Sequence, residues 1–180
     1  MPKPLSKFLL LQWPVNSLLP VFLPIPWLLK FQWHGKLYHR QVPGPLALQF
    51  LTESTQELVS YAEDKEAKIS IENMPERFSY LGNRAYELEN LTNETGCNIT
   101  IDLGHVNTCE DQESFFKIPN ILYNHINDND GIKDKHQAVG DGTLDLNLLK
   151  YVKNGIIELN NFDNVMKSKK VIEDFLSENK

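Results

Sequence analysis

Short apolar runs alternate with helical patterns after residue 53, and this alternation limits the folds that the chain can adopt. The runs with strand character are KISIE (68–72), NITIDL (98–103), ILYNHI (121–126) and GIIEL (155–159). Helical patterns separate or follow them, over residues 85–94, 111–116, 146–152 and 167–176. A parallel neighbour can be reached only through a crossover connection, so this order predicts βαβ units, a parallel sheet and an α/β fold.

Two local signals predict helix ends. Ser54 and Glu57 have the spacing of a capping box, which predicts a helix of about ten residues that begins near Ser54. Gly96 follows the helical pattern AYELENLTNE and is expected to end that helix.

Polar side chains stand at the carboxyl ends of all four predicted strands: Glu72, Asp102, His125 with Asp128, and Glu158. In a (β/α)8 barrel, catalytic groups converge at this face. A doubly wound sheet is the alternative fold, but no GxGxxG or P-loop pattern follows any of these strands. The pattern therefore favours a polar site at the strand ends over a phosphate-binding loop.

The loop from Asn124 to Gly142 holds two histidines, four aspartates and three glycines in nineteen positions, which is typical of metal ligation. The pair Asp102 and His105 is spaced D-x-x-H across a glycine turn, so both side chains are expected to point at one ion. Asp134 and His136, spaced D-x-H, can do the same from the loop. Mixed carboxylate and imidazole ligation suits Zn, Mn, Fe or Co, and a more oxygen-rich subset would accept Mg.

The first 52 residues differ in composition from the rest of the chain. They contain no Asp or Glu, all three tryptophans and eight of the ten prolines. The remaining part, 53–180, carries all twenty-four acidic and thirteen of the eighteen basic residues, a formal charge of −11. We expect residues 1–52 to be an atypical segment, non-native or poorly ordered, such as a shifted reading frame or a misplaced start would produce.

A membrane contact through residues 8–33 is the alternative interpretation of this segment, because these residues are mostly apolar. Pro14, Pro20, Pro24 and Pro26 argue against it, since each would remove a hydrogen bond from a membrane-spanning helix. The two cysteines, Cys97 and Cys109, lack CxxC spacing and form no disulfide framework, which favours a reducing compartment and a cytoplasmic location.

The strand-end blocks resemble the xylose isomerase-like TIM-barrel superfamily, which holds sugar phosphate isomerases and epimerases together with abasic-site endonucleases of the endonuclease IV type. The resemblance runs from about Ser54 to Leu176 and rests on five blocks in the right order: IEN (71–73), DLGH (102–105), HINDNDG (125–131), DKHQAVGDG (134–142) and IIEL (156–159). It implies a partial (β/α)8 TIM barrel, made of about four C-terminal βα units.

The resemblance also implies roles for individual residues. Glu72, Asp102, His125 and Glu158 would form the metal-binding quartet shared by the sugar epimerases. His105, Asp134 and His136 would join them in a multi-metal cluster in the endonuclease branch. Glu72 and Glu158 would be catalytic and move the proton at a sugar carbon. The expected cofactor is a divalent metal (Mn, Zn, Mg or Co), and the expected partner is a small-molecule sugar or sugar phosphate.

Two further hypotheses remain open. A DNA endonuclease is disfavoured by the −11 charge and by QVPGPLAL (41–48), which looks like the family's HPG strand end with Val42 in place of histidine. The other is an inactive fragment, because a full barrel needs about 250 residues. Half a barrel leaves two strand edges open, which favours aggregation or a homo-oligomer.

Overall fold

A four-stranded parallel sheet forms the centre of the protein in the computed structural model, which describes residues 28–33, 36–41, 44–76 and 81–179. The strands are β3 (Ser70–Glu72), β4 (Asn98–Asp102), β5 (Ile121–Ile126) and β6 (Gly155–Ile157), and they lie side by side in chain order. All three pairings are parallel, which confirms the predicted α/β fold. Sequential order without a reversal is the order of a barrel segment, since a doubly wound sheet reverses direction at its switch point.

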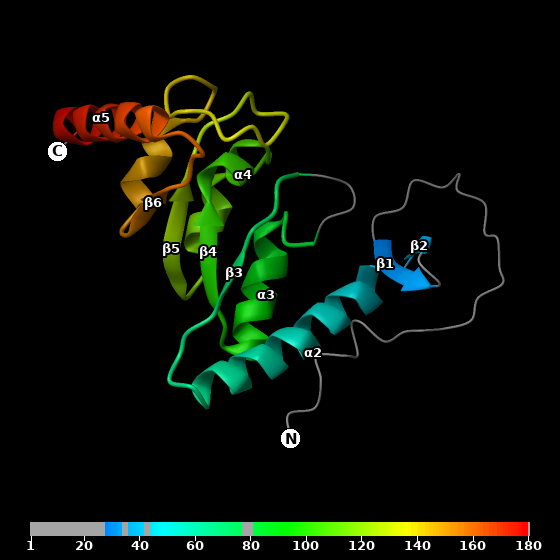
Figure 1. The fold of residues 1–180 in the computed structure, drawn as a ribbon. Coiled ribbons are helices and arrows are strands. Elements are labelled where there is room, and N and C mark those ends of the chain that lie inside the picture. Colours follow the sequence, from blue (N-terminus) through cyan, green and yellow to red (C-terminus); the bar gives the residue numbers. More distant parts are fainter. Residues whose placement is uncertain (1–27, 34–35, 42–43, 77–80, 180) are drawn as a thin grey trace.

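Helices precede, connect and follow the strands (Figure 1). The α-helices are α2 (Gly44–Glu63), α3 (Ala85–Thr95), α4 (Leu103–Asn107) and α5 (Phe162–Glu178). Two 3-10 segments, η1 (Glu113–Lys117) and η2 (Leu146–Tyr151), stand where the sequence predicted α-helices at 111–116 and 146–152. Such short segments close only one or two turns, for which the tighter 3-10 geometry is common.

The predicted helix ends were right at one position and wrong at two. Gly96 ends α3 in the left-handed conformation, with φ +72°, and its backbone N–H donates to Thr92 O at 2.9 Å. The capping box at Ser54 is wrong, because α2 begins at Gly44 and Ser54 lies inside it. The last helix also begins earlier than predicted, because Asn161 Oδ1 accepts from the backbone N–H groups that open α5.

The strands β1 (Leu28–Trp33) and β2 (Lys36–Gln41) form a separate antiparallel pair. The strand before the HPG-like sequence therefore lies in a hairpin instead of the parallel sheet, and Val42 itself is outside the described residues. So are residues 1–27, most of the predicted membrane-contact segment 8–33. The helix α2 runs without a break across residue 52, where the composition changes. No helix within the described ranges is long and apolar enough to cross a membrane.

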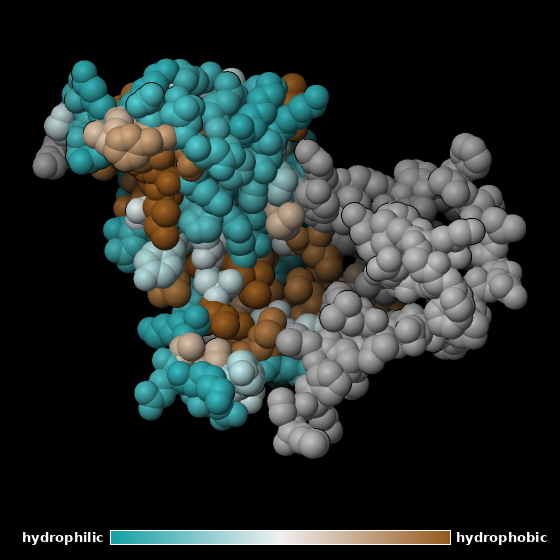
Figure 2. Space-filling model, in the orientation of Figure 1, coloured by the Kyte–Doolittle hydropathy of each residue, from teal (hydrophilic) through white to brown (hydrophobic). Residues whose placement is uncertain are grey.

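The hydrophobic core lies on one face of the sheet. Ile99 and Ile101 of β4 are completely buried there, against Leu88 and Leu91 of α3 and against Phe115 of η1. Side chains alternate along a strand, so Thr100 and Asp102 belong to the opposite face. In Figure 2, hydrophilic residues cover the upper part of the visible surface, where α4 and the loop after β5 lie, and hydrophobic residues gather below it.

Candidate metal centre

The first group of ligand-type side chains lies at the carboxyl edge of the sheet, where the strands of Figure 1 point toward α4 and the loop after β5. Parallel pairing sets Asp102 opposite His125 and brings β6 beside β5, so the strand ends meet at one edge. One ligand atom from each of four residues lies within 4.8 Å of those of the other three: Glu72, Asp102, His125 and Glu158.

The His125 ring nitrogen faces two carboxylates at once. Its Nδ1 atom lies 2.9 Å from Glu72 Oε1 and 2.9 Å from Glu158 Oε2. A ring nitrogen carries at most one hydrogen, so it cannot make a full hydrogen bond to both oxygens. A divalent cation between one imidazole and two carboxylates would satisfy all three atoms, and this donor set suits Zn or Mn.

Asp102 is the buried member of this group, with none of its surface exposed. Its Oδ1 atom accepts from the His105 backbone N–H at 2.8 Å, and Asn127 Nδ2 lies 3.1 Å from Oδ1 and 2.9 Å from Oδ2. The Asn73 side chain accepts from the Asp102 backbone N–H at 2.6 Å. Burial raises the pKa of the Asp102 carboxyl above its ordinary value, and the hydrogen bond from the His105 backbone N–H opposes this shift. A bound cation would favour the ionised form.

A second group consists of His105, Asp134 and His136, whose ligand atoms also lie within 4.8 Å of one another. His105 Nε2 is 3.2 Å from Asp134 Oδ2, and His136 Nε2 is 3.3 Å from Asp134 Oδ1. Each histidine places its Nδ1 on a backbone carbonyl, Asn73 O at 2.7 Å and Glu158 O at 3.1 Å. A carbonyl oxygen can only accept, so both Nδ1 atoms carry a hydrogen. In the neutral form of each ring, the Nε2 atom then carries a lone pair.

In this second group, hydrogen-bond acceptors therefore face one another: the Nε2 atoms of His105 and His136 and the carboxylate of Asp134. Among the described residues, Asp134 Oδ1 is buried and accepts no hydrogen bond. Two imidazole lone pairs and a carboxylate are therefore left to a cation or to added protons. Burial opposes the charged form of His136, but the hydrogen bond to Glu158 O and the charges of Asp134, Asp102 and Glu158 outweigh it and raise the pKa of this imidazole.

The structure divides the predicted ligands differently from the sequence spacing. Asp102 and His105, expected at one ion, fall into different groups, while Asp134 and His136 stay together. The reason is local: Asp102 caps α4 with its side chain, and the turn of this helix carries His105 away from the first group.

Asp128, which the sequence placed beside His125, organises the loop instead. It is 1% exposed, and its two oxygens accept from the backbone N–H groups of Asn129, Gly140, Gly142 and Leu144 at 2.7–3.0 Å. A Cβ atom on Gly142 would lie 2.1 Å from Asn129 O, so only glycine fits there. These contacts hold the conformation of the loop that carries Asp134 and His136.

Sequence reasoning missed the buried asparagines around both groups. Three of them, Asn73, Asn127 and Asn129, have no exposed surface. The first two form hydrogen bonds with Asp102, and Asn129 donates to Gly104 O. Their signal was present, because they lie inside the blocks IEN and HINDNDG. Only the contacts distinguish these amides from the many exposed asparagines of the chain.

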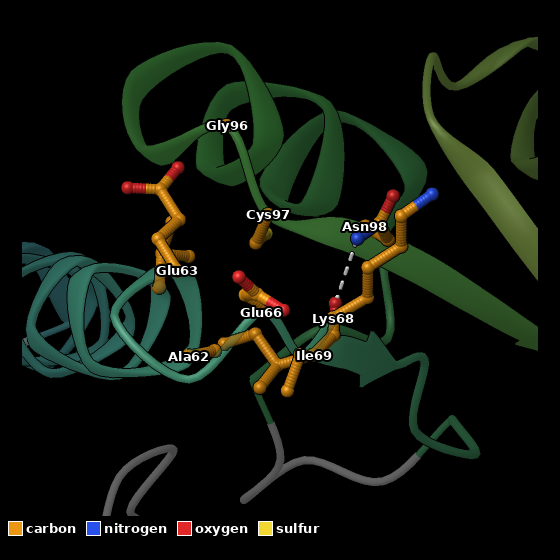
Figure 3. A pocket seen from close by; sticks show the side chains of 10 residues that line it. Ala62, Glu63, Glu66, Lys68, Ile69, Gly96, Cys97 and Asn98 are labelled. Carbon is orange, nitrogen blue, oxygen red and sulfur yellow. Dashed lines mark hydrogen bonds between the residues drawn. The ribbon is translucent and has the colours of Figure 1, made fainter.

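A separate cavity of about 340 Å³ lies at the opposite end of the strands (Figure 3). Glu63, Glu66 and Lys68 line it together with the buried Cys97, and Asn98 Nδ2 donates to Ile69 O at 2.9 Å beside it. No member of either ligand group lines this cavity. Cys97 and Cys109 are both free and buried, as the spacing predicted.

Comparison with known proteins decides the family. The chain matches the sequence model of a family described as xylose isomerase-like TIM barrel over residues 28–160. It belongs to this family. The resemblance of the strand-end blocks and the partial-barrel fold class are thereby confirmed.

Two relatives are uncharacterized proteins of Methanocaldococcus jannaschii. MJ1311 is 31% identical over an alignment of 135 positions that covers 67% of this chain and 46% of that protein. MJ1614 is 34% identical over 105 residues, 58% of this chain and 41% of that protein. The chain therefore spans less than half the length of these relatives.

Solved structures of related barrels also superpose on the chain. A D-tagatose 3-epimerase-like protein is 27% identical, with a TM-score of 0.66 over 76% of this chain and 59% of that one. The 3-keto-D-glucoside 4-epimerase of E. coli is 16% identical, with a TM-score of 0.55 over 72% and 53%. Endonuclease IV from Thermus thermophilus is 16% identical, with a TM-score of 0.59 over 73% and 58%. At 16% identity the last two show the shared fold alone.

Proposed function

We propose that this chain carries the site of a divalent-metal-dependent sugar isomerase or epimerase, acting on a sugar or sugar phosphate. The observation that supports it most is the placement of His125 Nδ1 between the Glu72 and Glu158 carboxylates, at 2.9 Å from each. The proposed ligands are Glu72, Asp102, His125 and Glu158, with Mn, Zn, Mg or Co as the ion. The similarity to a D-tagatose 3-epimerase-like protein supports this class of reaction.

Exposure assigns different tasks to the three carboxylates. Asp102 is fully buried and its oxygens already accept hydrogen bonds, so its task is to hold the ion. The side chains of Glu72 and Glu158 are 36% and 47% exposed, so a substrate can reach them. Each of them keeps a second carboxylate oxygen for acid–base work.

The reaction would proceed through these two glutamates. When bound, a divalent ion at this group supplies Lewis-acid polarisation of neighbouring carbonyl and hydroxyl oxygens of the sugar. Polarisation acidifies the hydrogen on the carbon next to the carbonyl, and one glutamate removes it as a general base. The other glutamate returns a proton to that carbon from the opposite side, which inverts the configuration there.

The test is proton exchange in deuterated water. Wild-type protein, supplied with Mn²⁺ and a panel of ketoses and ketose phosphates, should incorporate deuterium at the carbon next to the carbonyl. Glu158→Gln should abolish the exchange and leave the fold intact, because the amide cannot accept the proton. Glu173→Gln is the matched control, since Glu173 is exposed on α5, where it pairs with Lys169. Exchange that survives in Glu158→Gln contradicts the assignment.

The second candidate is an abasic-site endonuclease, which the assembly of His105, Asp134 and His136 favours. Three further ligands beside the first group would suit a multi-metal cluster that activates water against a phosphodiester. The −11 charge of residues 53–180 opposes DNA binding. Nicking of an abasic duplex at moderate salt, absent with undamaged DNA, would favour this candidate over the first.

An inactive fragment is the third hypothesis. Within the described residues, β3 and β6 each have a partner strand on one side only. A second copy of the chain could cover these edges, and a cytoplasmic homo-oligomer is part of the proposal. Size-exclusion chromatography with metal analysis separates the cases: a defined oligomer with stoichiometric metal supports the enzyme, and a metal-free aggregate supports the fragment.

A further inference from the structure

We propose that Asn127 is a positioning residue that holds the Asp102 carboxylate for metal binding, and that Gly104 is glycine because a larger residue would displace Asn127. This inference rests on the proposed metal-binding role of Asp102. It assigns a task to two residues that are not themselves ligands.

The contact between Asn127 and Asp102 is buried on both sides. Both side chains have no exposed surface, and Asn127 Nδ2 lies 3.1 Å from Asp102 Oδ1 and 2.9 Å from Oδ2. Asn127 is the side-chain donor that the structure gives to this carboxylate; the other donor is the His105 backbone N–H. The amide therefore sets the rotation of the carboxylate about its last bond.

The hydrogen bonds of Asp102 leave acceptor capacity for a cation. Oδ1 accepts from His105 N at 2.8 Å and lies 3.1 Å from Asn127 Nδ2. Oδ2 lies 2.9 Å from Asn127 Nδ2, and the two oxygens share this donor, because they lie in nearly the same direction from it. Oδ2 is therefore the less occupied oxygen, and the shared contact holds the plane of the carboxylate in place.

Gly104 leaves space for this amide. A Cβ atom built on Gly104 would lie 1.9 Å from Asn127 Oδ1 and 2.7 Å from its Cγ. Asn127 Oδ1 is itself buried and has no hydrogen-bond partner among the described residues, because it faces this glycine in α4. Gly104→Ala would therefore force the Asn127 amide out of its position and disturb its contact with Asp102.

A double-mutant cycle tests the inference through metal affinity, measured by Co²⁺ titration calorimetry on the full chain. Asn127→Ala and Gly104→Ala should each weaken Co²⁺ binding by roughly 10- to 100-fold, the usual effect of losing a residue that orients a ligand. The double variant should bind as tightly as Asn127→Ala alone, because the three atoms nearest to the added methyl group all belong to the Asn127 amide. Asn107→Ala is the control: Asn107 is a buried amide that bonds to Asn129 and Thr143 and to no ligand residue.

The outcomes are distinguishable. Wild-type protein that binds no Co²⁺ overturns the proposed function and this inference together. Wild-type binding that both single variants retain, or losses that add in the double variant, overturns this inference alone. If Gly104→Ala does not fold, recovery of folding in the double variant supports the same contact, and continued misfolding contradicts it. Thermal unfolding of all variants separates a loss of stability from a loss of affinity.

Discussion

The imidazole Nδ1 of His105 lies 2.7 Å from the backbone oxygen of Asn73, the residue after Glu72 at the end of β3. His136 repeats this relationship at the other edge, with Nδ1 3.1 Å from the backbone oxygen of Glu158. Each histidine of the second group is thus anchored to a strand end that carries a carboxylate of the first. The two groups share one scaffold, and a shift at either outer strand would disturb both.

Metal stoichiometry is expected to separate the two groups. His136→Ala removes one of three ligand-type side chains from the second group and leaves the first group's side chains untouched. We expect this variant to bind fewer equivalents of Zn²⁺ than the wild type, as measured by elemental analysis after dialysis, while His125→Ala loses the ion of the first group. An unchanged zinc content in His136→Ala would mean that the second group holds no ion.

The loop after β5 should depend on Asp128 for its stability. Asp128→Ala leaves four backbone N–H groups without their acceptor, and we expect a loss of about 3 kcal/mol in the free energy of unfolding. Urea denaturation measures the loss. Asp141→Ala is the control in the same loop, because Asp141 is exposed and its carboxylate pairs with Lys167. Equal stability of the two variants would contradict the role of Asp128.

The buried Glu87 should make stability depend on pH. Burial raises the pKa of its carboxyl above 4.5, although Oε2 accepts from the Gly82 N–H at 2.8 Å. As pH rises above 4.5, the unfolded chain ionises first, so the free energy of unfolding falls until the raised pKa of the folded protein is passed. Glu87→Gln removes this titration. Its stability relative to the wild type should therefore increase between pH 4 and pH 7 in urea denaturation, and a constant difference would refute the prediction.

The two thiols should be inert in the folded protein. Burial raises the pKa of the Cys109 thiol to about 11 and also raises that of Cys97. At pH 8 only about one Cys109 thiol in a thousand is then ionised, and the thiolate is the reactive form. Reaction with Ellman's reagent should be slow in buffer and fast in urea. Rapid labelling of the native protein would show that one of these sites opens.

The sequence predicted those parts of the fold that depend on local signals. The strand ILYNHI matches β5 (Ile121–Ile126), and Gly96 ends α3, because apolar alternation and a glycine stop act over a few residues. The start of α2 at Gly44 was missed. The capping-box pattern at Ser54 is a local signal too, but neighbouring residues continue the helix through it, and there the side chain has no helix end to cap.

Local signals also predicted which residue types form the site. Each strand pattern ends in a side chain that can bind a metal: Glu72, Asp102, His125 and Glu158. Their division into two groups did not follow from the residue spacing, although the family resemblance implied it. Asp102 and His105 are three positions apart, yet the α4 turn that Asp102 caps separates them, while strand pairing brings Glu72 to His125 from 53 positions away.

The sequence by itself thus determined the ligand types, the strand order and the family. Tertiary structure decided how closely the ligand-type side chains of each group approach one another and which polar residues support them. Asn127 and Gly104 show the reason: their relation is a close approach between β5's loop and α4, and such contacts depend on packing distances that no local pattern encodes.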